Sequence, residues 1–136
     1  MPDRLFTPAE ANSALDEVRA AAERLVGVRE RMRELEHTQG SLVTTIGGNG
    51  AGYAAGDLQA AQEELSGLAA AARACRERLD ELGVVVKDPD IGLLDFPAVR
   101  DGEDVELCWH VGEEAVAFWH RIGEGYAGRR PIDWED

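Results

Sequence analysis

The stretch LLDFPAVRDGEDVELCWH, residues 93–110, decides how the C-terminal third of this chain folds. Asp101-Gly102 near its middle favours a tight two-residue turn between antiparallel strands. With the turn there, Arg100 pairs with the oppositely charged Glu103, and side chains alternate between two faces. One face then carries Leu94, Phe96, Ala98, Val105, Leu107 and Trp109. We therefore predict a β-hairpin of fixed register, because a slip of one residue would move all these apolar side chains to the other face.

A long helix is predicted over residues 8–38. Before its first turn, the side chains of Thr7 and Glu10 can each accept a hydrogen bond from the other's backbone N–H, and Pro8 suits the first helical position. Apolar residues then recur at steps of three and four, which places them on one face of a helix. This stripe consists of Ala11, Leu15, Val18, Ala22, Leu25, Val28, Met32 and Leu35.

A second helix is predicted over residues 57–82, after a glycine-rich loop at residues 39–56. Its apolar residues alternate steps of three and four without a break, which is typical of a coiled coil. The seam consists of Leu58, Ala61, Leu65, Leu68, Ala72, Cys75, Leu79 and Leu82. Gly83 stands where a left-handed residue often ends a helix. Residues 50–55 loosely match a dinucleotide-binding fingerprint, but that fingerprint requires a strand–helix–strand unit, and a heptad helix follows here.

The rest of the chain is predicted to complete a C-terminal block. Residues 84–111 hold a short strand and the β-hairpin, residues 113–121 form a short helix, and residues 122–136 form an irregular tail. The expected fold class is α+β and mostly helical: a long antiparallel, coiled-coil-like helical hairpin with a C-terminal β-hairpin and a short helix. At this length, a single domain over residues 1–136 is the natural expectation.

Acidic residues outnumber basic ones by 27 to 14, and the formal net charge is −13. This excess argues against nucleic acid or an anionic membrane as a partner. No segment approaches the roughly 20 apolar residues that span a bilayer, and the first residues show no signal-peptide pattern. The two cysteines, Cys75 and Cys108, have neither zinc-finger nor redox spacing, so a reducing cytoplasm is expected. Lys87 is the only lysine.

The C-terminal third is similar to a known bacterial family. The runs KDPDIGLLDFP, VELCWHVGEEAVAFWH and GYAGRRPI, all within residues 87–132, carry the similarity, and FTPAEA at residues 6–11 extends it to the first helix. The chain thereby resembles the domain of unknown function DUF2203. The resemblance implies a small bacterial cytosolic protein and no established activity. The family usually has arginine where this chain has His110, which weakens any mechanism built on His110.

Potential metal ligands gather in the C-terminal block. Asp95, Cys108 and His110 fall on the polar face of the predicted hairpin, and Glu113 and His120 follow soon after. Oxygen, sulfur and nitrogen atoms of these kinds bind transition metals. We interpret Asp95, Glu113 and His120 as candidate ligands of a divalent transition metal, with His110 as a possible addition. The alternative is a structural role, because Glu113 and His120 would lie two helical turns apart, about 10 Å along the axis.

Three arginines stand out against the acidic background of the C-terminal segment: Arg121, Arg129 and Arg130. Guanidinium groups bind carboxylate and phosphate groups through paired hydrogen bonds. The three residues are therefore candidates for binding a small anion. The alternative is that they pair with the nearby acidic side chains.

The leading functional interpretation is a non-enzymatic interaction or scaffold module. It follows from the helical hairpin, the acidic surface and the lack of a recognisable catalytic set. A homodimer is expected, because two seams of leucine and alanine bury little apolar area by themselves, and a protein partner is the natural ligand. The alternative is a small metal-binding protein or metal-dependent enzyme with its site in the C-terminal block. Apart from that metal, no cofactor is evident, and the sequence does not decide whether the chain is an enzyme.

Overall fold

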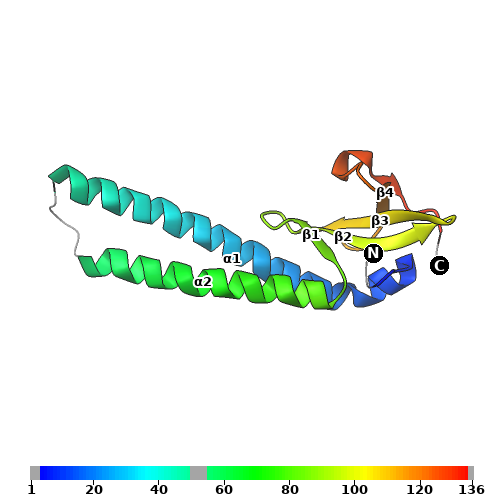
Figure 1. Ribbon diagram of the computed structural model, residues 1–136, viewed down its shortest axis with the longest axis horizontal. Helices are drawn as coiled ribbons and strands as arrows, with labels where there is room; N and C mark the ends of the chain where they lie inside the picture. Colours follow the sequence, from blue (N-terminus) through cyan, green and yellow to red (C-terminus); the bar gives the residue numbers. More distant parts are fainter. Residues whose placement is uncertain (1–3, 50–54, 135–136) are drawn as a thin grey trace.

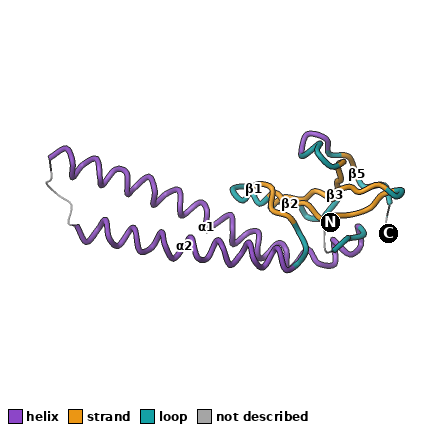
Figure 2. The backbone as a smooth tube through the Cα atoms, in the orientation of Figure 1, coloured by secondary structure: helices purple, strands orange, loops and turns teal. Residues whose placement is uncertain are grey.

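The computed structural model describes residues 4–49 and 55–134, which form two helices and a sheet in an elongated arrangement (Figure 1). The elements are α1 (Pro8–Asn49), α2 (Ala55–Glu81), β1 (Val85–Asp88), β2 (Leu93–Arg100), β3 (Glu103–His110), β4 (Phe118–Arg121), a 3-10 turn (Tyr126–Gly128) and β5 (Arg130–Pro131). The helices lie side by side, and the sheet packs at one end of the pair (Figures 1 and 2).

The predicted fold class, a long helical hairpin with a β-hairpin and a short helix, is wrong. The described residues form two helices and one five-stranded antiparallel sheet in the order β1-β2-β3-β4-β5. The segment predicted as an irregular tail, residues 122–136, supplies β5 and the 3-10 turn. Each strand neighbours the next one in sequence, so the sheet is a meander with short connections.

The predicted register of the central hairpin is confirmed. β2 pairs with β3 along its whole length, and Asp95 lies across from Cys108. The turn residues Asp101 and Gly102 have positive φ angles of 51° and 79°. A two-residue turn of this kind requires positive φ at both central positions, because only then does its twist match that of the strands.

Two predicted helix ends are also confirmed. Oγ1 of Thr7 accepts the N–H of Glu10 at 3.1 Å, and Oε1 of Glu10 accepts the N–H of Thr7 at 2.9 Å, which completes the capping box. At the end of α2, Gly83 has a φ angle of 90°. This left-handed residue lets the N–H of Val84 reach the carbonyl oxygen of Leu79 at 3.2 Å, and so satisfies one of the free carbonyls of the last turn.

The predicted glycine-rich loop is wrong over its first part. Instead of a loop over residues 39–56, α1 continues to Asn49 and α2 begins at Ala55. An isolated glycine such as Gly40 costs a helix only about 1 kcal/mol, an amount that pairing with a second helix offsets. Most of the stretch that resembles a dinucleotide fingerprint falls in residues 50–54, outside the described residues.

The predicted short helix at residues 113–121 is wrong as well, since Phe118–Arg121 is strand β4. The side chain of Asn12 in α1 explains the difference. Its Oδ1 accepts the backbone N–H of Val116 at 2.8 Å, and its Nδ2 donates to the carbonyl oxygen of Val116 at 3.1 Å. These bonds satisfy backbone groups that a helix would satisfy internally, and a stretch this short is marginal as a helix by itself.

The apolar core lies between the sheet, the first half of α1 and the last turns of α2. Its buried members are Phe6, Ala11, Leu15, Val18, Ala22, Leu25, Ala72, Cys75, Leu79, Val84, Leu94, Phe96, Ala98, Val105, Leu107, Trp109, Val116 and Trp119. All six residues of the predicted apolar hairpin face are among them. The core therefore fixes the orientation of the sheet and leaves its opposite face free for polar side chains.

Beyond the core, the two helices continue as a pair that we call the helical arm, residues 33–49 and 55–71. Figure 1 shows the arm extending away from the sheet. On α2, the arm's seam residues Leu58, Leu65 and Leu68 are only half-buried. Over the residues described, neither helix has an apolar stretch long enough to cross a membrane.

Candidate metal centre

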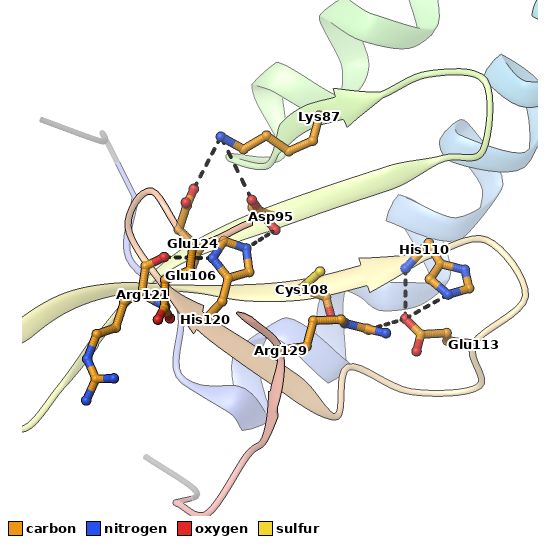
Figure 3. A network of polar contacts seen from close by, with 10 residues as sticks. All are labelled: Lys87, Asp95, Glu106, Cys108, His110, Glu113, His120, Arg121, Glu124 and Arg129. Carbon is orange, nitrogen blue, oxygen red and sulfur yellow. Dashed lines mark hydrogen bonds and ion pairs between the residues drawn. The ribbon is translucent and has the colours of Figure 1, made fainter. Parts of the chain in front are cut away.

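Three side chains with metal-binding groups meet on the outer face of the sheet, opposite to the core (Figure 3). Asp95 comes from β2, Cys108 from β3 and His120 from β4, which are neighbouring strands. Asp95 lies across from Cys108, and His120 lies across from Glu106 on the other side of β3. The side chains alternate along each strand, so burying Leu107 and Trp119 in the core turns this set outward.

The geometry of this cluster is compact. One ligand atom from each of Asp95, Cys108 and His120 lies within 4.8 Å of the others. Asp95 and His120 are 2% exposed and Cys108 is 1% exposed. A tetrahedral zinc ion with bonds of about 2.0–2.3 Å holds its ligand atoms about 3.5 Å apart, so atoms that lie within 4.8 Å of one another need to approach by at most about 1.3 Å. The cluster could hold a metal ion.

Hydrogen bonds fix the ring of His120. Its Nδ1 lies 2.9 Å from the carbonyl oxygen of Arg121, and its Nε2 lies 3.1 Å from Oδ1 of Asp95. A carbonyl oxygen only accepts, so Nδ1 carries a proton and donates it. A single proton then lies between Nε2 and the carboxyl group of Asp95. A metal ion bound to both groups would take the place of that proton.

Lys87 adds a positive charge at the rim of the cluster. It is the extra residue of a bulge where the register of β1 and β2 shifts. Its Nζ lies 3.9 Å from Oδ2 of Asp95 and 3.7 Å from Oε2 of Glu106. Burial raises the pKa of Glu106, and the Asp95 carboxylate raises it further, while Lys87 and His120 act in the opposite direction. The site therefore combines two carboxyl groups with a lysine and a histidine.

The thiol of Cys108 is a poor nucleophile in this setting. Burial and the neighbouring charge of Asp95 raise its pKa to about 12, although Arg129 lowers it somewhat. Nucleophilic cysteines have lowered pKa values and react as thiolates. The arrangement therefore does not favour covalent catalysis by Cys108. Metal binding is the chemistry that stabilises a buried thiolate, because the ion supplies the opposing charge.

A pocket of about 270 Å³ opens onto the cluster. Besides the three ligand residues it is lined by Lys87, Leu93, Glu106, Gly123, Gly125 and Tyr126. The loop after β4 forms one wall, where Gly123 and Gly125 have φ angles of 86° and 66°. Glycine adopts these angles without steric cost and lets the chain fold back over the sheet. A metal ion in the cluster would therefore keep one side accessible to water or a small molecule.

Glu113 and His110, also predicted as ligands, lie in a separate group farther along β3 (Figure 3). Oε1 of Glu113 accepts the backbone N–H of His110 at 3.0 Å and binds Nη2 of Arg129 at 2.6 Å. Arg129 also lies over the ring of Phe118, with its guanidinium carbon 4.2 Å from the ring centre. The structure thus brings together two of the predicted ligands, Asp95 and His120. Glu113 instead holds Arg129 and the backbone of His110 in place.

The three arginines predicted to bind anions each pair with a carboxylate. Arg129 pairs with Glu113 as described, Nε of Arg121 lies 3.3 Å from Glu103, and Arg130 makes two bonds to Glu124 at 2.8 and 3.0 Å. The bonds from Arg130 and from the backbone N–H of Arg121 lower the pKa of Glu124 to about 2. Anion binding at these arginines stays a prediction, and these internal pairs would compete with it.

Sequence reasoning left three residues out of its ligand set: Cys108, Lys87 and Glu106. For Cys108 the signal was present, since the hairpin register puts it across from Asp95. Glu106 faces the same side, two residues before Cys108, but an acidic residue on an outer face is usually only a solvated charge. The position of Lys87 depends on a bulge, for which the sequence gives no local mark.

Comparison with curated proteins and with solved structures gave no match. A family model described as "Uncharacterized conserved protein (DUF2203)" matches residues 4–132 of the 136-residue chain. The match spans both helices, all five strands and both polar groups of Figure 3. It agrees with the resemblance found in the C-terminal third. The chain belongs to the DUF2203 family.

Proposed function

We propose that this chain binds a divalent transition metal ion of the zinc type through Asp95, Cys108 and His120. The observation that carries the proposal is the meeting of a carboxylate, a thiol and an imidazole from three neighbouring strands, with ligand atoms within 4.8 Å of one another and all three side chains buried. Buried polar groups of this kind are costly unless they are paired or hold an ion.

The mixture of ligand atoms favours zinc over the common hard cations. Magnesium and calcium prefer sites built from oxygen atoms alone. Sulfur from Cys108 and nitrogen from His120 favour a softer, first-row transition metal, and zinc accepts oxygen, nitrogen and sulfur ligands together.

The surroundings of His120 support the same proposal. Histidines that bind metal nearly always donate their second ring N–H to a carbonyl or carboxylate, which fixes the orientation of the ring. The Nδ1–H of His120 does so toward the carbonyl oxygen of Arg121 at 2.9 Å. This bond leaves Nε2, which already faces Asp95, as the atom that would bind the ion.

The charges around the pocket also suit a divalent cation. An ion of charge two is balanced by the Asp95 carboxylate and the Cys108 thiolate, and Lys87 is balanced by Glu106 at 3.7 Å. Three protein ligands with one accessible side are typical of zinc sites that exchange a fourth ligand, whereas purely structural zinc sites are closed by four.

Elemental analysis tests this proposal on protein purified without a histidine tag and without chelator. We expect close to one zinc per chain, and close to none in Cys108→Ser or Asp95→Asn, which keep the size of the side chain. Glu113→Gln and His110→Ala, in the neighbouring polar group, are matched controls and should keep the metal. Circular dichroism checks that each variant is folded. Wild-type protein that stays free of metal after incubation with zinc, cobalt or manganese would rule the proposal out.

A second candidate function, the homodimeric interaction module, is favoured by the helical arm. Leu58, Leu65 and Leu68 on α2 are only half-buried in the single chain, and a second copy or another helical partner would cover them. Light scattering over a range of concentrations tests the homodimer, and a monomer throughout would remove it. A reducing cytoplasm suits either function, because both cysteines are free and a metal-binding thiol must stay reduced.

A further inference from the structure

We infer that the metal centre and an apolar groove beside it form one composite site for a small monoanionic molecule, with a carboxylate-like head group on the metal and an apolar chain in the groove. The inference rests on the proposed metal function and extends it to a class of ligand.

The groove lies on the same outer face of the sheet and has a volume of about 480 Å³. It is lined by Leu5, Val85, Pro97, Ala98, Asp104, Val105, Glu106 and Ile122. Three of these, Leu5, Val85 and Ile122, are large apolar residues that are 49%, 43% and 61% exposed. Ligand pockets typically have a volume of about 300–1,000 Å³ and mostly apolar walls, so the groove falls within that range.

The groove and the metal pocket are neighbours along β2 and β3. Asp95 and Cys108 form one cross-strand pair of the outer face, and Pro97 and Glu106 form the next pair of the same face. Glu106 lines both the pocket and the groove. Successive pairs on one face of a strand are about 6.8 Å apart, a distance that an extended chain of about six carbons covers.

The charges decide which head group fits. The accessible side of a bound divalent ion attracts an anionic oxygen ligand, and Nζ of Lys87 lies at the rim, 3.9 Å from Oδ2 of Asp95. Asp104 and Glu106 line the groove itself, so a second negative charge on the ligand would be repelled there. A single anionic group followed by an apolar chain satisfies both parts of the site.

Hydroxamates of different chain length test the inference on cobalt-loaded protein, because they bind such metals as carboxylate analogues and change the visible spectrum of cobalt. We expect hexanohydroxamate to bind at least about 30-fold more tightly than acetohydroxamate, since each buried methylene raises affinity about fourfold when fully covered. Ile122→Asp should abolish this gain, so that the two hydroxamates bind the variant with equal affinity, because a charged side chain replaces an apolar wall of the groove. Ile91→Asp is the matched control, because Ile91 is also exposed, at 51%, but lines neither cavity.

The possible outcomes separate this inference from the proposed function. A cobalt spectrum with equal affinity for both hydroxamates would overturn the composite site and leave the metal centre standing. Protein that binds no cobalt would overturn both. A wild-type dimer that Ile122→Asp, but not Ile91→Asp, converts to a monomer would show that a second copy covers the groove, and this too would overturn the inference. The chain-length gain, lost only in Ile122→Asp, supports it.

Discussion

The helical arm differs in packing from the sheet end of this protein, by which we mean the sheet and the helix turns that pack on it. In the arm, the two helices pack against each other, Arg33 makes an ion pair with Asp90 beyond β1, and the described seam residues of α2 are half-buried. At the sheet end, α1, α2 and the strands share one core, in which Leu25, Leu94, Phe96 and Trp109 are completely buried. The polar groups that could do chemistry lie on the outer face of that sheet. Rigid packing therefore coincides with the candidate site, whereas the arm supplies length and surface.

The candidate site lies where the fold is most tightly packed. A sheet that is packed on one face presents its other face as a rigid platform, and side chains from adjacent strands hold fixed distances there. A pair of helices in contact along a narrow seam has less buried area per residue and opens more easily.

Removing a large side chain should lower the free energy of unfolding far more at the sheet end than in the arm. Phe96 is 0% exposed and its ring meets that of Phe6 edge-on, with the ring centres 5.1 Å apart. We expect Phe96→Ala to lower the free energy of unfolding by about 3–5 kcal/mol. Leu65→Ala in the arm should cost about 1 kcal/mol, because that side chain is only half-buried. Urea denaturation measures both. An equal loss in the two variants would show that the arm is buried, as in a dimer.

Zinc should stabilise the sheet end and leave the arm unchanged. At a free concentration of about 100 times the dissociation constant, bound zinc adds about 2.7 kcal/mol to the free energy of unfolding. Hydrogen exchange should then slow in β2, β3 and β4, whereas amides of the arm should exchange as before, since they open locally. The Cys108→Ser variant serves as the control without metal. Equal protection in both regions would contradict this picture.

The hydrogen bonds between α1 and the segment before β4 should make an intermediate contribution to the free energy of unfolding. Asn12→Ala removes both hydrogen bonds to the backbone of Val116, which is 4% exposed. Leaving buried backbone groups without partners should cost about 2 kcal/mol in the free energy of unfolding. Ser13→Ala changes the next, exposed residue of the same helix and should have little effect. Thermal denaturation of the two variants, with wild type beside them, makes the comparison.

The smallest expected effect is a pH dependence at the sheet end. Arg130 and the Arg121 backbone lower the pKa of Glu124 from the usual 4.5 to about 2. A carboxyl group whose pKa is lowered on folding adds stability above its unfolded pKa and loses it as the pH falls toward the folded one. Stability from this pair should therefore decline between about pH 4.5 and 2. Glu124→Gln should lose this part of the acid dependence, which unfolding curves at several pH values can detect.

Local sequence signals predicted part of this molecule well. Asp101-Gly102 fixed the hairpin register, Thr7 and Glu10 marked the start of α1, and Gly83 marked the end of α2. Each of these signals depends on interactions between residues that are close in the sequence, so the sequence alone is enough to identify it. The same register placed Asp95 and Cys108 across from each other, which is half of the candidate site.

The rest depended on contacts between distant parts of the chain. Strand β4 forms because Asn12 binds Val116 across 104 positions and because β3 offers it an unpaired edge. His120 reaches Asp95 and Cys108 only because β4 pairs with β3, so a prediction that made the segment helical could not place it there. Helix periodicity alone also failed to find where α1 ends, since glycine weakens a helix by an amount that a neighbouring helix can offset.

Lys87 has a practical consequence for anyone who handles this protein. Its side chain is the only lysine amine in the sequence, and it lines the pocket above the Asp95, Cys108 and His120 cluster. Amine-reactive coupling to a sensor chip through Lys87 would therefore obstruct this pocket. The same amine-reactive chemistry could instead attach a fluorescent dye to Lys87, beside the cluster, without an engineered residue.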